Sequence, residues 1–290
     1  MTILLVGLVT LGAFGTELVF LRPVTWLGDL VTTENSVLIG TIGQVVEMTY
    51  EGKTLRTLSF PAGQVQALAL GQGYLCAGGW DFLRLWSWPK GEHVRDIQGF
   101  GIMVRAVALA AGLALVAGSD GQVRAFSLTS GELLWSLRAH EGTIWGIAAG
   151  AEIFATAGSD RAALWHLKTR AEAFSFPGRA WDVAFSSDGF LLAGGVGKIL
   201  KVWDTACGLT FFEAWAHESC TVAVAFSPDG KMVATGSLDQ TAALWDLEKE
   251  VLVQRIRGFT SLVTAVGFSA DAGFLVAGGE DGTLAILRLP

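Results

Sequence analysis

The sequence predicts an all-β fold, a seven-bladed β-propeller made of four-stranded antiparallel blades. Three observations lead to this prediction: short runs rich in Val, Ala and Thr are separated by turn residues, the pattern recurs along the chain, and each recurrence holds four runs. Apolar runs of about four to six residues between turn signals are typical of strands. Evenly spaced four-strand repeats indicate a ring of blades, because each repeat buries its apolar face only against its neighbours.

The clearest repeat spans Ser219–Asp246 and predicts a meander of three strands. Its apolar runs are Val222–Phe226, Met232–Thr235 and Thr241–Trp245. The first turn between them is Ser227-Pro228-Asp229-Gly230, in which Pro pre-sets φ and Gly tolerates a positive φ. The second turn is Gly236-Ser237-Leu238-Asp239. This repeat is the reference to which the rest of the chain is aligned.

Seven units follow from aligning the residue that ends the third strand of each repeat. These anchor residues are Met48, Trp86, Phe126, Trp165, Trp203, Trp245 and Leu287. They lie 38, 40, 39, 38, 42 and 42 residues apart. Small residues precede most anchors at the turn from the second strand to the third, as in Ala117-Gly118-Ser119. We number the units 1 to 7, and unit 1 depends on spacing more than on motif because Met48 takes the aromatic position.

The fourth strand follows the anchor in every unit except unit 7, after which the sequence stops at Pro290. At the other end, Gly15–Arg22 (GTELVFLR) aligns with the fourth strand of unit 3, Gly131–Arg138 (GELLWSLR). We therefore expect an N-terminal strand at about 16–22 to complete the C-terminal blade and close the ring, which removes two exposed sheet edges. Residues 1–290 would then form a single β-propeller domain, with its seven blades in 15–290.

Residues 1–14 remain as an apolar overhang outside the blades. Their composition resembles the core of a signal peptide, but the first basic residue is Arg22 and the run is too short to span a bilayer. A strand, a docking segment and a targeting remnant all remain open interpretations of the overhang. We expect no membrane span elsewhere in the sequence.

Composition narrows the class of protein further. Hydrophobic residues make up 51% of the chain and charged residues 16%, which is ample for a core and unlike a disordered chain. The net charge of −7 would repel a phosphate backbone, so direct nucleic-acid binding is not expected. Cys76, Cys207 and Cys220 form neither a CxxC pair nor an even framework, which favours a reducing compartment such as the cytoplasm.

The motifs of units 5 and 6 resemble those of the WD-repeat (Trp-Asp repeat) β-propeller family. The Trp-Asp dipeptide occurs as Trp203-Asp204 and Trp245-Asp246, and unit 6 also contains the AFSPDG and GSLDQT elements. The resemblance covers about residues 15–290; it is strong in units 4 to 6, fair in units 2, 3 and 7, and poor in unit 1. It implies a rigid ring that other proteins bind.

Two sets of residues combine a histidine, a hydroxyl, a carboxylate and a tryptophan, as a hydrolase site would. They are His140, Thr156, Asp160 and Trp165 in unit 4, and His217, Thr235, Asp239 and Trp245 in unit 6. The family resemblance implies that these positions form hydrogen-bonded tetrads that join neighbouring strands, and the duplication also favours a structural role over a unique active site. We therefore predict a protein that is not an enzyme.

Cofactor motifs do not change this prediction. The four histidines are scattered over separate repeats, no Cys/His cluster has the spacing of metal ligands, and no phosphate-binding loop is present. We expect no cofactor and no metal. One phrase, Ala125–Trp135, is similar to the repeat of quinone-cofactor propellers, and such a propeller remains a minor alternative.

Partner-binding residues are predicted on the top face of the ring, at the mouth of the central channel. In the family, the second residue of each first strand lies there, which implies Thr25, Gln66, Arg105, Trp145, Trp181, Val222 and Thr264. The residue before the turn Asp lies on the same face and adds Trp80, Leu238 and Glu280. Trp and Arg are enriched at interface hot spots, so Trp80, Arg105, Trp145 and Trp181 would form a binding arc. The alternative is that these tryptophans plug the channel.

A second candidate surface is the outer strand of unit 5, Leu209–Trp215. Phe211 and Trp215 should point to one side of this strand and Phe212 to the other, so both sides carry aromatic residues. A partner could cover this blade rim, or neighbouring blades could bury it.

These observations together predict a non-enzymatic scaffold that presents a rigid surface to peptides or proteins. Because one fold serves many roles, the step from fold to function is an analogy. The alternative function is a constitutive structural subunit of a large multiprotein or ribonucleoprotein assembly.

Overall fold

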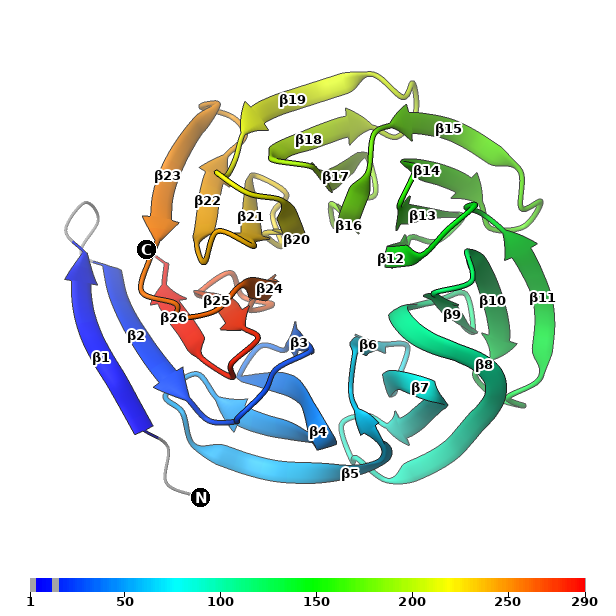
Figure 1. The fold of residues 1–290 in the computed structure, drawn as a ribbon, viewed down its shortest axis with the longest axis horizontal. Helices are drawn as coiled ribbons and strands as arrows, with labels where there is room; N and C mark the ends of the chain where they lie inside the picture. Colours follow the sequence, from blue (N-terminus) through cyan, green and yellow to red (C-terminus); the bar gives the residue numbers. More distant parts are fainter. Residues whose placement is uncertain (1–3, 12–15, 290) are drawn as a thin grey trace.

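In the computed structural model, the described residues, 4–11 and 16–289, form a ring of antiparallel β-sheets around a central channel (Figure 1). No helix occurs within these residues. The structure therefore confirms the prediction of an all-β propeller with antiparallel blades, and three of its six sheets have the predicted four strands.

The strands follow the predicted units closely. The N-terminal pair is β1 (Leu4–Leu11) and β2 (Thr16–Arg22). Unit 1 contains β3 (Asp29–Thr32), β4 (Ser36–Thr49) and β5 (Thr54–Gln64). Units 2 and 3 contain β6 (Ala67–Gly71), β7 (Tyr74–Ser87), β8 (His93–Ala110), β9 (Leu113–Gly118), β10 (Gln122–Ser127) and β11 (Leu133–Arg138).

The last four units are more regular. Unit 4 contains β12 (Ile144–Ala149), β13 (Ile153–Gly158), β14 (Arg161–His166) and β15 (Glu172–Pro177). Unit 5 contains β16 (Ala180–Phe185), β17 (Leu191–Val196), β18 (Ile199–Asp204) and β19 (Thr210–Trp215). Unit 6 contains β20 (Thr221–Phe226), β21 (Met232–Ser237), β22 (Ala242–Asp246) and β23 (Val251–Ile256). Unit 7 contains β24 (Val263–Phe268), β25 (Phe274–Gly279) and β26 (Leu284–Arg288).

The predicted number of seven separate blades is wrong, because the strands form six hydrogen-bonded sheets. The difference comes from β8, which runs without a break from unit 2 into unit 3. Its first part pairs with β7, from His93 opposite Trp86, and its last part pairs with β9, from Val104 opposite Gly118. One six-stranded sheet, β11-β10-β9-β8-β7-β6, therefore contains both units.

The N-terminal strand closes the ring as predicted. β2 pairs antiparallel with β26, with Leu18 opposite Leu287 and Leu21 opposite Leu284. β1 then pairs with β2 and adds a fifth strand to the outside of this sheet, as Figure 1 shows. The overhang is thus a strand over Leu4–Leu11, and its remaining residues lie outside the described ones. Because β2 and β26 lie far apart in the sequence, closure of the ring is a non-local contact.

Apolar anchors and small residues build the core between neighbouring units. Every anchor is buried, from Met48 at 0% exposure to Trp245 at 6%. The small-residue turns permit this packing: a Cβ added to Gly78 would lie 2.4 Å from Val104 Cγ1 of the next unit. Close approach of the next first strand, rather than turn conformation, explains why the sequence has glycine there.

Candidate functional site

The tetrad of unit 4 is a chain of hydrogen bonds that joins two strands, β13 with Thr156 and β14 with Trp165, to the two connecting segments that contain His140 and Asp160. Trp165 Nε1 donates to Thr156 Oγ1 at 2.9 Å, and Thr156 Oγ1 lies 2.7 Å from His140 Nε2. His140 Nδ1 lies 2.5 Å from Asp160 Oδ1. If His140 is neutral with its proton on Nδ1, each group in the chain donates to the next, which ends at the carboxylate. Arg161 pairs with the other oxygen of Asp160 and closes the network.

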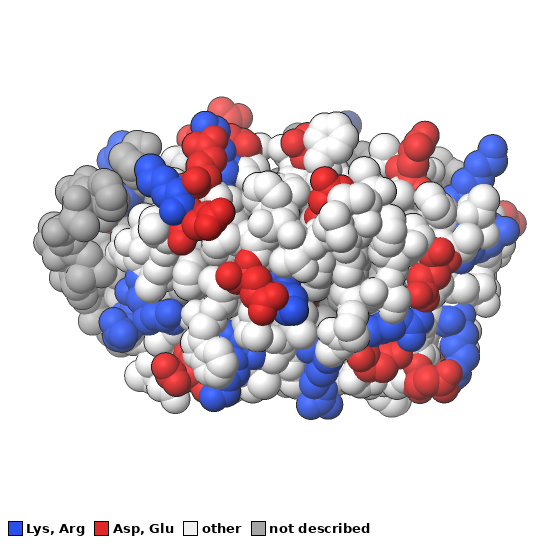
Figure 2. All heavy atoms as spheres, turned by 90° about the horizontal axis from the view of Figure 1, so that it is seen from above, with Lys and Arg blue, Asp and Glu red and all other residues white. Residues whose placement is uncertain are grey.

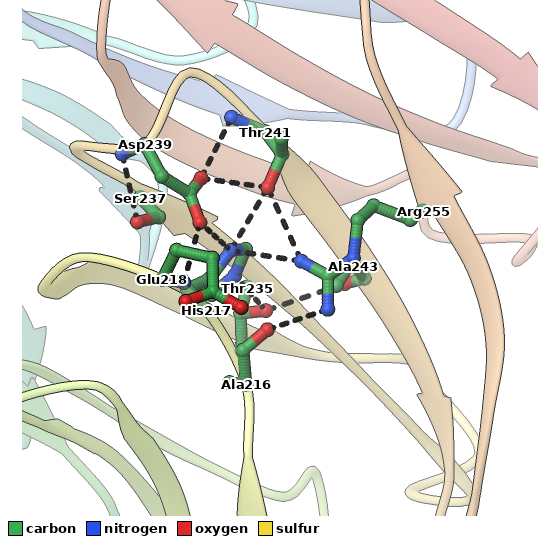
Figure 3. A network of polar contacts seen from close by, with 9 residues as sticks. All are labelled: Ala216, His217, Glu218, Thr235, Ser237, Asp239, Thr241, Ala243 and Arg255. Atoms are coloured by element: carbon green, nitrogen blue, oxygen red, sulfur yellow. Dashed lines mark hydrogen bonds and ion pairs between the residues drawn. The ribbon is translucent and has the colours of Figure 1, made fainter.

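The tetrad of unit 6 has a different arrangement (Figure 3). His217 Nε2 lies 2.8 Å from Thr235 Oγ1, and His217 Nδ1 lies 3.2 Å from Asp239 Oδ2. Arg255, which the sequence analysis did not include, lies 3.1 Å from His217 Nδ1 and donates to the carbonyl of Ala216. The expectation that the tryptophan joins the tetrad is wrong here, because Trp245 Nε1 has no hydrogen-bond partner among the described residues.

Burial decides what these tetrads can do chemically. Thr156 and Thr235 are 0% exposed, so no substrate reaches either hydroxyl. Burial lowers the pKa of His140, and it lowers the pKa of His217 to about 4. Both imidazoles are therefore neutral near pH 7, and the closed hydrogen-bond chains join strands rather than expose a nucleophile.

The mouth of the central channel brings together most of the predicted top-face residues. A cavity of about 380 Å³ lies there. Its lining includes the predicted residues Gln66, Arg105, Trp145, Trp181, Val222, Leu238 and Thr264. These residues come from six consecutive units, because the inner strand of each unit begins at this end of the channel. Arg105 Nη1 donates to Gln66 Oε1 at 3.2 Å, which links two adjacent units across the mouth.

Trp145 and Trp181 form an aromatic platform at this mouth. Their rings stack with centroids 4.3 Å apart and an interplanar angle of 21°. The guanidinium of Arg179 lies 4.9 Å from the centroid of Trp145 and 5.2 Å from that of Trp181. A cation at this distance from an aromatic face is attracted by the ring quadrupole. Sequence reasoning missed Arg179, although its position two residues before Trp181 on the same approach to the mouth was a usable signal.

Two carboxylates in the same cavity were also missed. Asp182 follows the predicted mouth residue Trp181 of unit 5, and Asp29 follows Gly28 at the start of the inner strand of unit 1. The other units have Ala or Gly at this position. Burial raises the pKa of Asp29 to about 7. Burial, opposed by a hydrogen bond from Val224 and reinforced by the charge of Asp29, raises the pKa of Asp182 to about 7. Comparing these positions across the aligned units would have found Asp182 but not Asp29, because the predicted mouth residue of unit 1 was Thr25.

Three predicted mouth residues do not line the cavity. Trp80 is 60% exposed and lies within strand β7, where it pairs with Met103 of β8. Glu280 is held in its turn by backbone hydrogen bonds to Leu27 and Leu262. Thr25 lies outside the inner strand of unit 1, which begins at Asp29, so Gly28 takes the expected position. Of the four residues of the predicted arc, the structure brings Trp145, Trp181 and Arg105 to the cavity and leaves Trp80 outside its lining.

The rim of unit 5 divides its aromatic residues between solvent and core. Phe211 is 56% and Trp215 61% exposed, whereas Phe212 is buried and packs against Trp245 of unit 6. Including Phe212 among surface residues was therefore wrong. Figure 2 views the ring edge-on from the side of β19, where uncharged atoms cover most of the middle band and charged side chains gather along both margins.

Residues 4–11 and 16–289 contain neither a cluster of metal ligands nor a membrane-crossing helix. Within this part of the chain, no group of three or more His, Cys, Asp or Glu residues is placed to hold a metal ion. In the same residues, no helix has the length and hydrophobicity that crossing a bilayer requires.

Comparison with known proteins supports the family resemblance. Residues 172–204, 209–246 and 250–286 match the family described as WD domain, G-beta repeat (WD40). Autophagy-related protein 16 from Arabidopsis thaliana is 25% identical over 178 residues, which cover 59% of this chain and 35% of that protein. The chain therefore contains WD40 repeats, as the motifs of units 5 and 6 predicted.

Two further relatives match over shorter stretches. U3 snoRNP-associated protein-like EMB2271 from Arabidopsis thaliana is 37% identical over 81 residues, covering 27% of this chain and 17% of that protein. Protein groucho from Drosophila melanogaster is 32% identical over 96 residues, covering 32% of this chain and 13% of that protein. The matched regions thus span about a third or less of each of these three relatives.

Proposed function

We propose that this protein, whose chain contains WD40 repeats, is a non-enzymatic interaction module that binds a segment of a protein partner at the mouth of its central channel. The observation that carries this proposal is the stacked pair of Trp145 and Trp181 beside a cavity of about 380 Å³. Both side chains are half-buried and line the cavity, which favours a wall of the channel mouth over a plug.

The physical basis is a rigid and partly apolar surface that requires little ordering on binding. Trp, Tyr and Arg residues contribute most to binding free energy at protein interfaces, and three such residues meet here: Arg105, Trp145 and Trp181. The stack and the Arg179 guanidinium hold the rings before any partner arrives. A preformed platform lowers the entropic cost of association. A closed ring suits this role because its rigid strands hold the platform in place before binding.

A protein partner fits the charge of the molecule better than a nucleic acid does. The net charge of −7 opposes approach of a phosphate backbone. Relatives such as autophagy-related protein 16 and groucho also belong to WD-repeat proteins, which supports a scaffold role without specifying the partner.

The alternative is a constitutive subunit of a larger multiprotein or ribonucleoprotein assembly, docked through the rim of unit 5. Its supporting observation is the exposure of Phe190, Leu209, Phe211 and Trp215, which range from 56% to 69%. Exposed apolar groups of this size mark interaction surfaces when they cluster. One relative is described by its name as U3 snoRNP-associated, which is compatible with this alternative.

The test compares partner recovery by three variants in affinity purification with quantitative mass spectrometry. Trp145→Ala/Trp181→Ala removes the platform, Phe211→Ala/Trp215→Ala removes the rim, and Trp80→Ala is the control for an exposed tryptophan outside the cavity. We expect the platform variant alone to lose at least tenfold of the partner signal. Loss with the rim variant and not with the platform variant would replace the proposal by the assembly alternative.

A further inference from the structure

A second groove lies on the bottom face, between units 3 and 4, at the opposite ends of the inner strands from the channel mouth. Its volume is about 680 Å³. One wall is the outer strand of unit 3, with Leu134 and Trp135, and the other is the turn from β14 to β15, residues 166–170. Ala111 and Ala151 at its inner end also line the adjoining cavity that reaches toward the channel.

The groove exists because the turns between first and second strands differ around the ring. In units 5, 6 and 7 this turn has a serine that bonds an aspartate, as Ser227 Oγ does with Asp229 Oδ1 at 2.6 Å. Units 3 and 4 have Ala111 and Ala151 in the corresponding turns and expose both. The bottom face therefore has polar turns at units 5 to 7 and exposed alanines at units 3 and 4.

Leu134 shows that this surface is not covered within the described chain. Its side chain is 54% exposed, on the outer strand of unit 3, next to the half-buried Trp135. Burying an exposed leucine and part of an indole is favourable, so the groove offers a place for an apolar side chain of a partner.

The opposite wall is basic, although the chain as a whole is acidic. His166, Lys168 and Arg170 line it, with Glu152 as the only acidic lining residue. Neither Lys168 nor Arg170 forms an ion pair with another described residue. Their positive charges are therefore free to pair with a partner, so the groove favours a negatively charged one.

Arg170 is held in an unusual conformation at this wall. Its φ is +61°, at the turn position where units 2, 3 and 5 have Gly91, Gly131 and Gly208, all with positive φ. Residues other than glycine are disfavoured in this region of φ, so Arg170 adopts its conformation at a local free-energy cost. Its guanidinium lies 6.0 Å from the centroid of Trp135, which places the charge over the groove.

We propose that this groove binds an extended acidic peptide segment, with an apolar side chain against Leu134 and Trp135 and carboxylates facing Lys168 and Arg170. This site is independent of the channel mouth, because it lies at the other end of the inner strands and shares no lining residue with it. The complementary charge, rather than the apolar surface alone, identifies the occupant as an acidic segment.

The test measures fluorescence anisotropy with two labelled nine-residue peptides. In one, leucine alternates with glutamate, and in the other lysine replaces each glutamate. We expect the acidic peptide to bind, the basic peptide to bind at least tenfold more weakly, and the affinity for the acidic peptide to fall with added salt. Equal binding of both peptides, or no binding of the acidic one, would overturn the proposal.

Matched variants locate the binding. Arg170→Gly should weaken the acidic peptide at least fivefold while leaving the thermal midpoint unchanged or higher, because glycine suits this φ. Glu250→Gly, which changes a non-glycine residue with φ of +57° at the same turn position of unit 6, is the control and should leave binding unchanged. Leu134→Asp should also abolish binding.

Two other outcomes would refute the proposal, one by placing the peptide at another site and one by identifying another occupant of the groove. Loss of binding in Trp145→Ala/Trp181→Ala, with Arg170→Gly unaffected, would place the peptide at the channel mouth. A concentration-dependent dimer in light scattering that Leu134→Asp abolishes would identify a second copy of the chain as the occupant.

Discussion

The carboxylate of Asp182 accepts a hydrogen bond from the backbone N–H of Val224, at 2.9 Å from Oδ2, and thereby joins the inner strands of units 5 and 6. Asp29 does the same between units 1 and 2, because its Oδ2 accepts from Leu68 N at 2.7 Å. Each carboxylate also accepts from the backbone N–H of the residue that follows it. Two side chains thus connect neighbouring units along the channel wall, where strand pairing does not.

The first prediction concerns the pH dependence that Asp182 contributes. The pKa of Asp182 rises from 3.8 in the unfolded chain to about 7 in the fold, so the folded state binds the proton of this carboxyl more tightly than the unfolded state does. The stability that this proton contributes is present below about pH 4 and is lost as the pH rises to about 7. Asp182→Asn should remove that slope. Between pH 4.5 and 7.5, urea unfolding should show the variant gaining about 1–2 kcal/mol relative to the wild type, with allowance for solvent in the channel. Parallel profiles would contradict the prediction.

The second prediction concerns His217, whose contribution has the opposite sign. Burial lowers its pKa from 6.5 to about 4, so the unfolded chain takes up its proton first and stability is lost as pH falls from 6.5 to 4. His217→Gln should cost about 1–3 kcal/mol at pH 7, and this cost should shrink toward pH 4. The measurement is the difference in unfolding free energy between variant and wild type, which cancels the aspartate contribution. A cost that stays the same between pH 7 and pH 4 would contradict the prediction.

The third prediction compares the two tetrad threonines. Thr156 Oγ1 contacts both His140 and Trp165, whereas Thr235 Oγ1 contacts His217 and, at 3.5 Å, the carbonyl of Ala243. Thr156→Val should therefore leave two buried partners unsatisfied and cost about 2–4 kcal/mol, against about 1–2 kcal/mol for Thr235→Val. Chemical denaturation at pH 7 measures both. A larger loss in Thr235→Val would show that Arg255 makes unit 6 the more strongly coupled network.

The fourth prediction separates β1 from β2 by truncation. Removing residues 1–11 deletes an outer strand and leaves the pairing of β2 with β26 intact, so the thermal midpoint should change by less than about 5 °C. Removing residues 1–22 opens the ring and exposes the edge of β26, and should lower the midpoint by more than about 10 °C or make the protein aggregate. Similar behaviour of both truncations would contradict closure by β2.

Phe20 offers a point-mutation control for the same closure. It is 5% exposed and packs edge-to-face on Phe259, with ring centroids 5.5 Å apart. Phe20→Ala should cost about 3–5 kcal/mol without altering the length of the chain.

Much of the fold could be predicted because repetition averages out the ambiguity of single strands. One apolar run could be a strand or a buried helix turn, but the seven aligned anchors share one spacing, and all seven are buried in the structure. The same alignment predicted that residues 16–22 form the strand that closes the ring. The continuous strand β8 could not be predicted in this way, because the alignment treats each unit separately and does not show that one strand pairs with both β7 of unit 2 and β9 of unit 3.

The candidate site could be predicted only in part, because it depends on which side chains meet across units. Family position placed Arg105, Trp145 and Trp181 at the mouth, but not the partners that orient them. Trp80 has the same residue type but lies outside the cavity, within the continuous strand β7, and its side chain is 60% exposed.

The sequence by itself determined the all-β class, the period of the repeat and the strand that closes the ring, since local turn chemistry and strand patterning are encoded within each unit. Only the tertiary structure decided which residues become a surface. It placed Phe212 in the core and Phe211 at the surface, and it brought Arg179 near two tryptophans and Arg170 near Trp135. It also placed Asp29 and Asp182 in one channel cavity. These are contacts between units, and their geometry depends on how the units pack around the ring rather than on the residues within any one repeat.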